Sequence, residues 1–323
     1  MTPKVRLAVG TVASVALLAV LVRFVPVDEV VATLAGARTD LLLCVLGLHL
    51  VILLLRVHRW AVIAEQGEPL SRAQRTLAFD SLFFSWLANF ALPAKAGDLA
   101  RPLVYAQASG RPYSELLGAT VLERVLDLAC LGVGFAAAMW LLPTPDGMPD
   151  WLRSIGVLAA LAAAGVVGGL QLLRGVTRFS EAGDGLRAKV AREANRFRDG
   201  LVLLDRPRVL ARAVAWSVVI WIIEAFSIGV LIEACHADAT ASASVAVVVA
   251  IALAVPIPSA PGQLGVAQWV SLAILQPYGI PADAAVAVSL LDTATALCWV
   301  VPFGLFAMIR RSALTTLREA EPE

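Results

Sequence analysis

Long runs of apolar residues constrain this chain more than any other feature of its sequence. A helix that crosses a hydrocarbon core of about 30 Å needs about 20 largely apolar residues. Segments of that length occur at residues 5–25, 41–63, 116–142, 154–173, 213–234 and 284–309. The composition, with 59% hydrophobic and 16% charged residues, fits no soluble class. We therefore predict an all-α integral membrane protein with six transmembrane helices.

The charge balance and the motif content exclude several function classes. The chain has 26 Lys and Arg residues against 25 Asp and Glu residues, so it carries no basic footprint for nucleic acid. Its four cysteines lie singly in apolar stretches, without the spacing of a disulfide framework or a zinc site. No P-loop, Rossmann glycine motif or G-x-S-x-G is present. We expect a transporter-like protein rather than an enzyme, with no metal and no cofactor.

The distribution of Lys and Arg predicts the orientation in the membrane. Residues 174–212 contain ten basic residues and residues 56–75 contain four, whereas the connections expected on the other side contain few. Basic loops remain cytoplasmic, so we expect an inner-membrane protein with both termini, including the tail 310–323, in the cytoplasm. Apolar residues recur at helical spacing within 174–212, which predicts an amphipathic segment along the inner membrane surface.

Two further apolar stretches, 76–108 and 242–276, must begin and end on one side of the membrane if the other spans keep this orientation. Lys95 and Asp98 make a return crossing after the first stretch implausible, and the second limb, 264–276, spans only about 20 Å. We therefore predict two re-entrant helical hairpins that enter from opposite faces.

With these assignments the chain divides into two repeats, 1–142 and 154–309, each with the order span, span, hairpin, span. The first repeat begins inside and the second outside, which is the inverted-topology layout of many secondary transporters. Proline, glycine and leucine recur at the same offsets in Pro93 to Leu99 and in Pro258 to Leu264. Broken helices inside a membrane are tolerated only where protein or a water-filled cavity satisfies the backbone. The predicted hairpin breaks are Pro93, Gly97, Pro258, Pro261, Gly262 and Gly265.

Ionisable residues inside the membrane are candidates for function, because a charge at the bilayer centre costs about 2.5–3.5 kcal/mol on insertion scales. The densest group lies on the first hairpin and on the span that follows it. Its members are Lys95, Asp98, Arg101, Glu123, Arg124 and Asp127. Glu123 and Asp127 share one helix face, and Arg124 points to an adjacent one. These residues either contact a lipid headgroup or form a structural ion network between hairpin and helix.

Isolated polar residues in apolar segments give weaker signals. Candidate polar or coupling-ion positions are Glu224, Gln263, Gln268 and Asp292. For Asp80, a structural role is favoured. The three histidines, at positions 49, 58 and 236, are predicted to be isolated and incidental, and the Arg59–Trp60 pair resembles an interfacial anchor.

Several of these residues together resemble a known family. They are Asn89 to Pro93, Gly97-Asp98-Leu99 with Arg101, Glu123 to Asp127, Pro258, Pro261-Gly262 and Gly265-Val266. The combination resembles the lysylphosphatidylglycerol synthase transmembrane region, or flippase-like, family, which includes the membrane portion of the multiple peptide resistance factor. The resemblance covers nearly the whole chain and implies a protein that moves a lipid between leaflets.

Two departures qualify what the resemblance implies. Asp98 stands where the family usually has glutamate, which keeps the carboxylate. Gln268 stands where the second hairpin usually carries a glutamate, which removes a charge. The family's soluble aminoacyl-transferase domain has no counterpart in the 323 residues, so we expect no lipid aminoacylation.

The sequence thus predicts a flippase-like translocase for an anionic or aminoacylated phospholipid, or for a polyprenyl-phosphate-linked lipid. A second copy of the chain or a separate lipid-modifying synthase is a candidate partner. The alternatives are a membrane-embedded transferase on a lipid-linked substrate and a non-transporting scaffold.

Overall fold

Helices are the only regular elements in the part of the chain that the structure describes, which confirms the predicted all-α class. This computed structural model describes residues 23–91, 96–142, 185–254 and 263–320, with Leu21 and scattered positions between 154 and 179. Some predicted features lie wholly or largely outside the described residues. They are the spans 5–25 and 154–173, Lys95, and the hairpin breaks Pro93, Pro258, Pro261 and Gly262.

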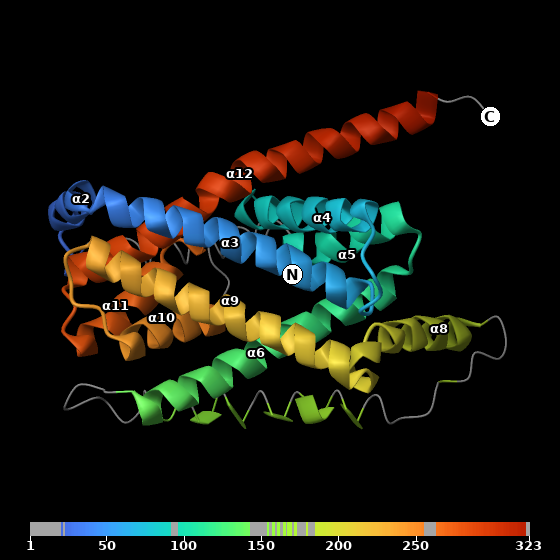
Figure 1. Ribbon diagram of the computed structural model, residues 1–323, viewed down its shortest axis with the longest axis horizontal. Helices are drawn as coiled ribbons and strands as arrows, with labels where there is room; N and C mark the ends of the chain where they lie inside the picture. Colours follow the sequence, from blue (N-terminus) through green and yellow to red (C-terminus); the bar gives the residue numbers. More distant parts are fainter. Residues whose placement is uncertain are drawn as a thin grey trace.

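Three long apolar helices run through the molecule (Figure 1). They are α3 (Thr39–Ala64), α9 (Pro207–Ala234) and α12 (Ala282–Ala320). In length and composition, Thr39–Ala64, Pro207–Ala234 and Ala282–Arg311 are sufficient to cross a membrane. They contain the predicted spans 41–63, 213–234 and 284–309. Helix α9 begins earlier than predicted because Pro207 occupies its first turn, where the missing N–H of proline costs nothing.

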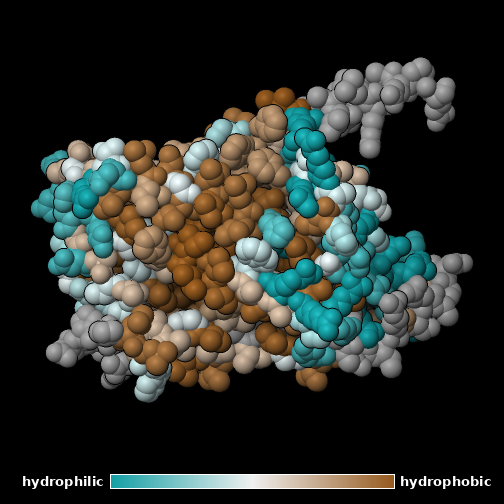
Figure 2. Space-filling model, viewed as in Figure 1, coloured by the Kyte–Doolittle hydropathy of each residue, from teal (hydrophilic) through white to brown (hydrophobic). Residues whose placement is uncertain are grey.

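The surface of the molecule agrees with a membrane setting. Figure 2 shows a broad hydrophobic band across the middle of the long axis, with hydrophilic residues gathered toward the two ends. Exposed apolar side chains such as Leu43, Ile222 and Phe306 come from the three long helices. An apolar surface of this extent on a monomer indicates contact with lipid or with another protein.

Helix α6 (Tyr113–Leu141) coincides with the predicted span 116–142. Its 29 residues are about 43 Å long, more than a hydrocarbon core requires. Unlike the three long helices, α6 carries Glu123, Arg124 and Asp127 in one and a half turns. Because these charges interrupt its apolar surface, the path of α6 across the membrane stays a prediction. The charges need partners from other helices.

Two pairs of shorter helices occupy the positions of the predicted hairpins. Helices α4 (Arg72–Ala91) and α5 (Ala96–Ser109) pack together, as do α10 (Ala241–Ala254) and α11 (Val266–Leu275). The 14 residues of α5 and of α10 are about 21 Å long, too short to cross alone. Figure 1 places the two pairs toward opposite ends of the molecule. Re-entry into a membrane and the inverted relation of the two repeats stay predictions.

The contact between α4 and α5 depends on a glycine. A Cβ atom added to Gly97 would lie 2.0 Å from the Ser85 carbonyl oxygen and 2.6 Å from Asn89 Oδ1. The Ser85 hydroxyl also donates a hydrogen bond to the Gly97 carbonyl, at 2.7 Å. Gly97, predicted as a helix break, thus lies where the first turn of α5 presses against α4. Small residues serve the same purpose in other membrane helix interfaces.

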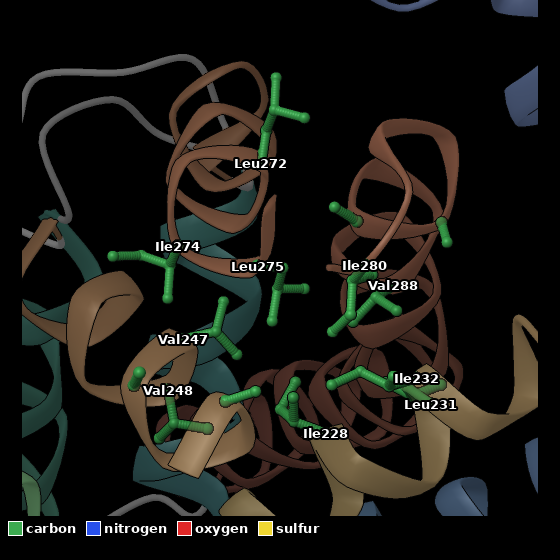
Figure 3. Packing of buried hydrophobic residues seen from close by; sticks show 14 of the residues in the cluster. Ile228, Leu231, Ile232, Val247, Val248, Leu272, Ile274, Leu275, Ile280 and Val288 are labelled. Atoms are coloured by element: carbon green, nitrogen blue, oxygen red, sulfur yellow. The ribbon is translucent and has the colours of Figure 1, made fainter. Parts of the chain in front are cut away.

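The buried apolar residues form two clusters, one near each helix pair. The first joins α10 and α11 to the last turns of α9 and to the first turns of α12. Figure 3 shows its centre, where Ile228, Leu231, Val247, Leu275 and Val288 converge from these four helices. The second cluster joins α4 and α5 to the end of α3 and the beginning of α6. Each helix pair is therefore anchored in its own core.

The connections contain helices that the sequence analysis did not predict or did not delimit. Helix α2 (Val27–Gly36) lies in a stretch that was expected to be a loop. Helix α8 (Leu186–Asp199) falls within the predicted amphipathic segment 174–212 and packs against α6. The Ser114 hydroxyl donates to the Glu193 carboxylate across this contact, at 2.6 Å, and so holds the pKa of Glu193 below its usual value. Short 3₁₀ helices, η2 (Val202–Asp205) and η4 (Gln276–Tyr278), follow α8 and α11.

Replacing Gly97 by alanine is expected to destabilise the α4–α5 pair. The new methyl group must displace backbone atoms of α4, and overpacking of this kind costs about 1–3 kcal/mol. Thermal unfolding of the purified protein in detergent, followed by size-exclusion chromatography, measures the loss. Gly47→Ala on α3 is the matched control, because nothing lies within 4 Å of an added Cβ atom there. Equal unfolding temperatures for the two variants would show that the close approach at Gly97 is unimportant.

Candidate functional site

A buried arginine on α3 joins two acidic residues of α6. Arg59 is 1% exposed, and its guanidinium donates hydrogen bonds to both carboxylate oxygens of Asp127, at 2.5 and 3.0 Å. It also donates to Glu123 Oε1 at 2.8 Å and to the Ser217 hydroxyl of α9 at 2.7 Å. The planar fork of arginine suits this bidentate geometry. Glu123 and Asp127 share one face of α6, as predicted, and α3 supplies the cation between them.

A second buried arginine extends this network to the first helix pair. Arg101 of α5 is 3% exposed, and its Nη1 lies 2.6 Å from Glu123 Oε2. Its guanidinium stacks over the indole ring of Trp60, with Cζ 4.1 Å from the ring centroid. The Trp221 indole N–H of α9 donates to Asp127 Oδ1 at 3.0 Å. Arg59, Arg101, Glu123 and Asp127, hereafter the buried ion network, therefore connect α3, α5 and α6, with α9 at their edge.

An ion pair with a different setting lies beside this network. Arg124 Nη2 donates to Asp98 Oδ2 at 3.1 Å, and the Arg124 side chain is 46% exposed. The Asn89 amide of α4 donates to the other Asp98 oxygen at 3.0 Å and so holds the carboxylate in place. Arg124 leaves the face of α6 that carries Glu123 and Asp127, as its sequence spacing predicts.

Asp98 and Arg124 border an open pocket of about 250 Å³ between α5 and α6. Its remaining lining residues are Leu99, Leu117, Thr120, Val121, Val125 and Leu128. The α5–α6 pocket therefore presents an apolar wall with one cation and one anion at its edge. A ligand with an apolar part and a charged part fits such a lining better than a wholly polar one.

The charges cancel separately within the buried ion network and within the ion pair at the pocket. Two arginines and two carboxylates cancel within the buried ion network, and Asp98 cancels Arg124 at the pocket. Buried charges are tolerated when they are paired and hydrogen-bonded. The network is closed to solvent, whereas Arg124 can exchange its partner because nearly half of its side chain is accessible. The structure thus brings together five of the six predicted cluster residues, and the sixth, Lys95, lies outside the described residues.

The singly predicted polar residues lie in other places. Gln268 is 1% exposed, and its Oε1 accepts the Gly265 backbone N–H at 2.6 Å, so it caps α11. Gly265 itself has a φ of 88°, a conformation that favours glycine. Gln263, with a φ of 59°, lies in the turn before α11. These residues shape the entry to α11, and among the described residues no hydrogen bond or ion pair joins them to the buried ion network.

The other acidic singletons each lie beside an arginine or histidine side chain. Asp80 accepts hydrogen bonds from the Arg310 guanidinium, with Nε at 3.0 Å from Oδ2, which agrees with its predicted structural role between α4 and α12. Glu224 pairs with Arg56 at 3.2 Å. Asp292 lies 3.3 Å from the His49 imidazole. The prediction that His49 is isolated is therefore wrong.

Sequence reasoning also misplaced Arg59. The position of Arg59 and Trp60 near the end of an apolar span predicts an interfacial anchor, because long side chains there usually reach the headgroup region. In the structure both residues are buried, at 1% and 0% exposure, and Arg59 is the centre of the buried ion network. The available signal was the excess of carboxylate on one face of α6, which requires a cation from another helix. Ser217, Trp221 and Asn89 carried no such signal.

The described residues give no support for a metal centre. No group of three or more His, Cys, Asp or Glu side chains with metal-binding geometry occurs among them. The four cysteines are free thiols. The carboxylates of the site lie against arginine guanidinium groups and against tryptophan or asparagine N–H groups, which are the partners of an anion.

Comparison with protein families places most of the chain within a family model. The family model described as the lysylphosphatidylglycerol synthase TM region matches residues 6–304. The matched range contains the three long helices up to Gly304, both helix pairs, the buried ion network and the α5–α6 pocket. A search of curated proteins finds no match.

Loss of Arg59 is expected to destabilise the fold far more than loss of Arg124. Arg59→Met leaves two buried carboxylates short of a cation, and breaking a buried ion pair costs about 3–5 kcal/mol. Arg124→Met frees a carboxylate that water can reach, so the cost is under about 1 kcal/mol. Arg59→Lys keeps the positive charge but loses the planar, bidentate guanidinium, so its stability should lie between those of Arg59→Met and Arg124→Met. Thermal unfolding in detergent compares the three, and equal stability of Arg59→Met and Arg124→Met would contradict this account of the network.

Proposed function

Because the chain belongs to the lysylphosphatidylglycerol synthase TM region family, we propose that it translocates a phospholipid between the leaflets of the cytoplasmic membrane. Family membership and the three long apolar helices support a membrane protein that acts on lipid. The flippase activity, the inner-membrane location and the cytoplasmic termini belong to this proposal.

The half-exposed Arg124, paired with Asp98 at the edge of a largely apolar pocket, is the observation that carries the proposal. A lipid phosphate replaces Asp98 as the partner of Arg124, because a phosphate can accept both N–H groups of a guanidinium edge. Asp98, held by Asn89, is then free to pair with an ammonium group of the same lipid. A headgroup with a phosphate and an ammonium, as in a zwitterionic or aminoacylated phospholipid, therefore complements the charges of the pocket. Its phosphate pairs with Arg124 and its ammonium with Asp98.

The apolar wall of the pocket suits the rest of such a lipid. Leu99 is 60% exposed on α5, and Leu117, Val121 and Leu128 line α6 beside it. The first carbons of the acyl chains pack against this wall while the chains remain in the bilayer. Only the headgroup then needs a polar path, which lowers the cost of crossing the hydrocarbon core.

The buried ion network supports this site without contacting the lipid in the conformation described. Arg101 and Glu123 tie α5 to α6, and Arg59 ties both to α3, so Asp98 and Arg124 face each other across a fixed gap. Arg101, Glu123 and Asp127 become lipid contacts only when the two helices separate. Lys95 is proposed as a second phosphate ligand.

Alternating access comes from motion of one repeat against the other, with the two helix pairs as the elements that open and close. The α4–α5 and α10–α11 pairs lie toward opposite ends of the molecule in Figure 1 and are anchored in separate apolar cores. This arrangement supports a mechanism in which each pair gates one side.

Reconstitution into liposomes tests the proposal. Vesicles contain trace phosphatidylglycerol, lysylated phosphatidylglycerol or polyprenyl phosphate with a fluorophore on the apolar chain, and a membrane-impermeant quencher reports transfer between leaflets. We expect wild-type protein to transfer at least one lipid faster than protein-free vesicles. Arg124→Ala should reduce the rate about tenfold or more, because a hydrogen bond to a charged group contributes about 1.5–3 kcal/mol.

Two controls make the outcome specific. Arg38→Ala removes an arginine from an exposed ion pair with Asp40, 2.8 Å apart, and should leave the rate unchanged. Asp98→Asn should reduce transfer of the lysylated lipid more than that of the anionic lipid. Absence of transfer of any lipid by the wild type, or equal rates for Arg124→Ala and Arg38→Ala, would contradict the proposed function.

A further inference from the structure

A histidine–aspartate pair lies among the three long helices, and neither residue lines the α5–α6 pocket. The Nε2 atom of His49 on α3 is 3.3 Å from Asp292 Oδ1 on α12. Arg56, further along α3, pairs with Glu224 of α9 at 3.2 Å. Each of the three long helices therefore contributes an ionisable residue to one interior region.

These residues lie at a common depth. His49 is ten residues from the start of α3, Glu224 is ten residues from the end of α9, and Asp292 is ten residues from the start of α12. The end of α9 lies beside the start of α3, since the Arg38 N–H donates to the Ala234 carbonyl at 3.0 Å. The start of α12 is held beside them through α2, where the Thr33 hydroxyl donates to Asp283 at 2.5 Å. Ten helical residues span about 15 Å, half of a 30 Å hydrocarbon core.

The His49 imidazole is buried, and one of its two nitrogen atoms has no hydrogen-bond partner among the described residues. His49 is 4% exposed, and its Nδ1 atom is buried without a hydrogen-bond partner. The charged groups that act on the ring are Asp292 from α12, Glu224 from α9 and Arg56 from α3. Arg56 and Glu224 cancel each other as a pair. Asp292 therefore has a cation partner only when His49 is protonated.

From this geometry we propose that His49 and Asp292 form a proton-binding site near the membrane centre. In the neutral imidazole, Nε2–H donates to the Asp292 carboxylate and Nδ1 keeps its lone pair. A proton from water adds to Nδ1 and forms an N–H bond, which yields an imidazolium–carboxylate pair with no net charge. Release of that proton to water restores the neutral ring and leaves one net negative charge. An unpaired charge at this depth is unfavourable. In the deprotonated state the surrounding helices must therefore supply a compensating cation to Asp292, whereas in the protonated state they need not.

A chain of contacts runs from Arg56, whose charge acts on the His49 ring, to the buried ion network. The Arg56 guanidinium lies over the Trp221 ring, with Cζ 4.9 Å from the centroid. The Trp221 N–H donates to Asp127 at 3.0 Å. When His49 loses its proton, the negative Asp292 attracts Arg56 and competes with Glu224 and the indole for it. On this basis, and resting on the proposed function, proton movement at His49 drives lipid translocation.

The proton site is tested without any transport measurement. The chain has three histidines, so ¹⁵N-histidine labelling in nanodiscs gives three imidazole signals that single substitutions to glutamine assign. We expect the His49 ring signals to move from the imidazolium form toward the neutral form as the pH of the sample is raised. In Asp292→Asn the imidazolium fraction at a given pH should fall. A His49 ring that stays neutral throughout, or that is unaffected in Asp292→Asn, would overturn the proposal.

The coupling is tested in the liposome assay with a transmembrane pH gradient of one unit and the membrane potential clamped. The measured quantity is the ratio of the transfer rates of fluorescent phosphatidylglycerol with and without the gradient. One pH unit is a tenfold difference in proton activity, so the wild-type ratio can reach about tenfold. His49→Gln should lower the ratio to one, whereas His58→Gln, on the same helix, should keep the wild-type ratio.

The two outcomes separate the proton site from the proposed function. A His49→Gln ratio equal to that of the wild type would refute coupling through this pair. If the wild type moves no lipid under any condition, the translocase proposal fails, and the imidazole signals still decide whether His49 and Asp292 bind a proton.

Discussion

The neutralisation of Arg59 is the interaction on which the site depends. A guanidinium with 1% exposure in an apolar helix is stable only if carboxylates compensate it in the same place. Glu123 and Asp127 do so from α6, and Glu123 in turn binds Arg101 of α5. Helix α3 is thereby fixed to the consecutive helices α5 and α6, and the α5–α6 pocket takes its shape from that constraint.

This constraint separates the charges into those that hold the fold and those that can act. Arginine and carboxylate cancel within the buried ion network, so no charge there is available to a ligand in the conformation described. Arg124, one residue from Glu123 on α6, lines the pocket instead, where Asp98 is its nearest carboxylate, at 3.1 Å, and Asp127 is farther away, at 3.9 Å. Farther along α3, His49 and Asp292 form a pair whose net charge depends on one proton. The chain therefore combines the buried ion network, whose charges are paired, with two adaptable ion pairs. Arg124 can exchange its anionic partner, and His49 can gain or lose a proton.

Much of the architecture could be predicted from the sequence, because it follows from local patterns. Helix length and apolar content predicted α3, α9 and α12, and the breaks at Gly97 and Gly265 marked the two helix pairs. The spacing of Glu123 and Asp127 predicted their common face. Arg59 was misjudged because its partners lie 64 and 68 residues away, and only the packing of α3 on α6 reveals them. His49 and Asp292 are farther apart still, and nothing local to either residue signals the other.

Photocrosslinking of a bound lipid tests the central claim most directly. Phosphatidylglycerol with a photoreactive group at the start of one acyl chain is irradiated with the protein in nanodiscs, and crosslinked peptides are identified by mass spectrometry. The account predicts crosslinks at Leu99, Leu117 and Val121 of the α5–α6 pocket that disappear in Arg124→Ala and persist in Arg38→Ala. Crosslinks confined to the outer surfaces of the three long helices, or unchanged in Arg124→Ala, would contradict it.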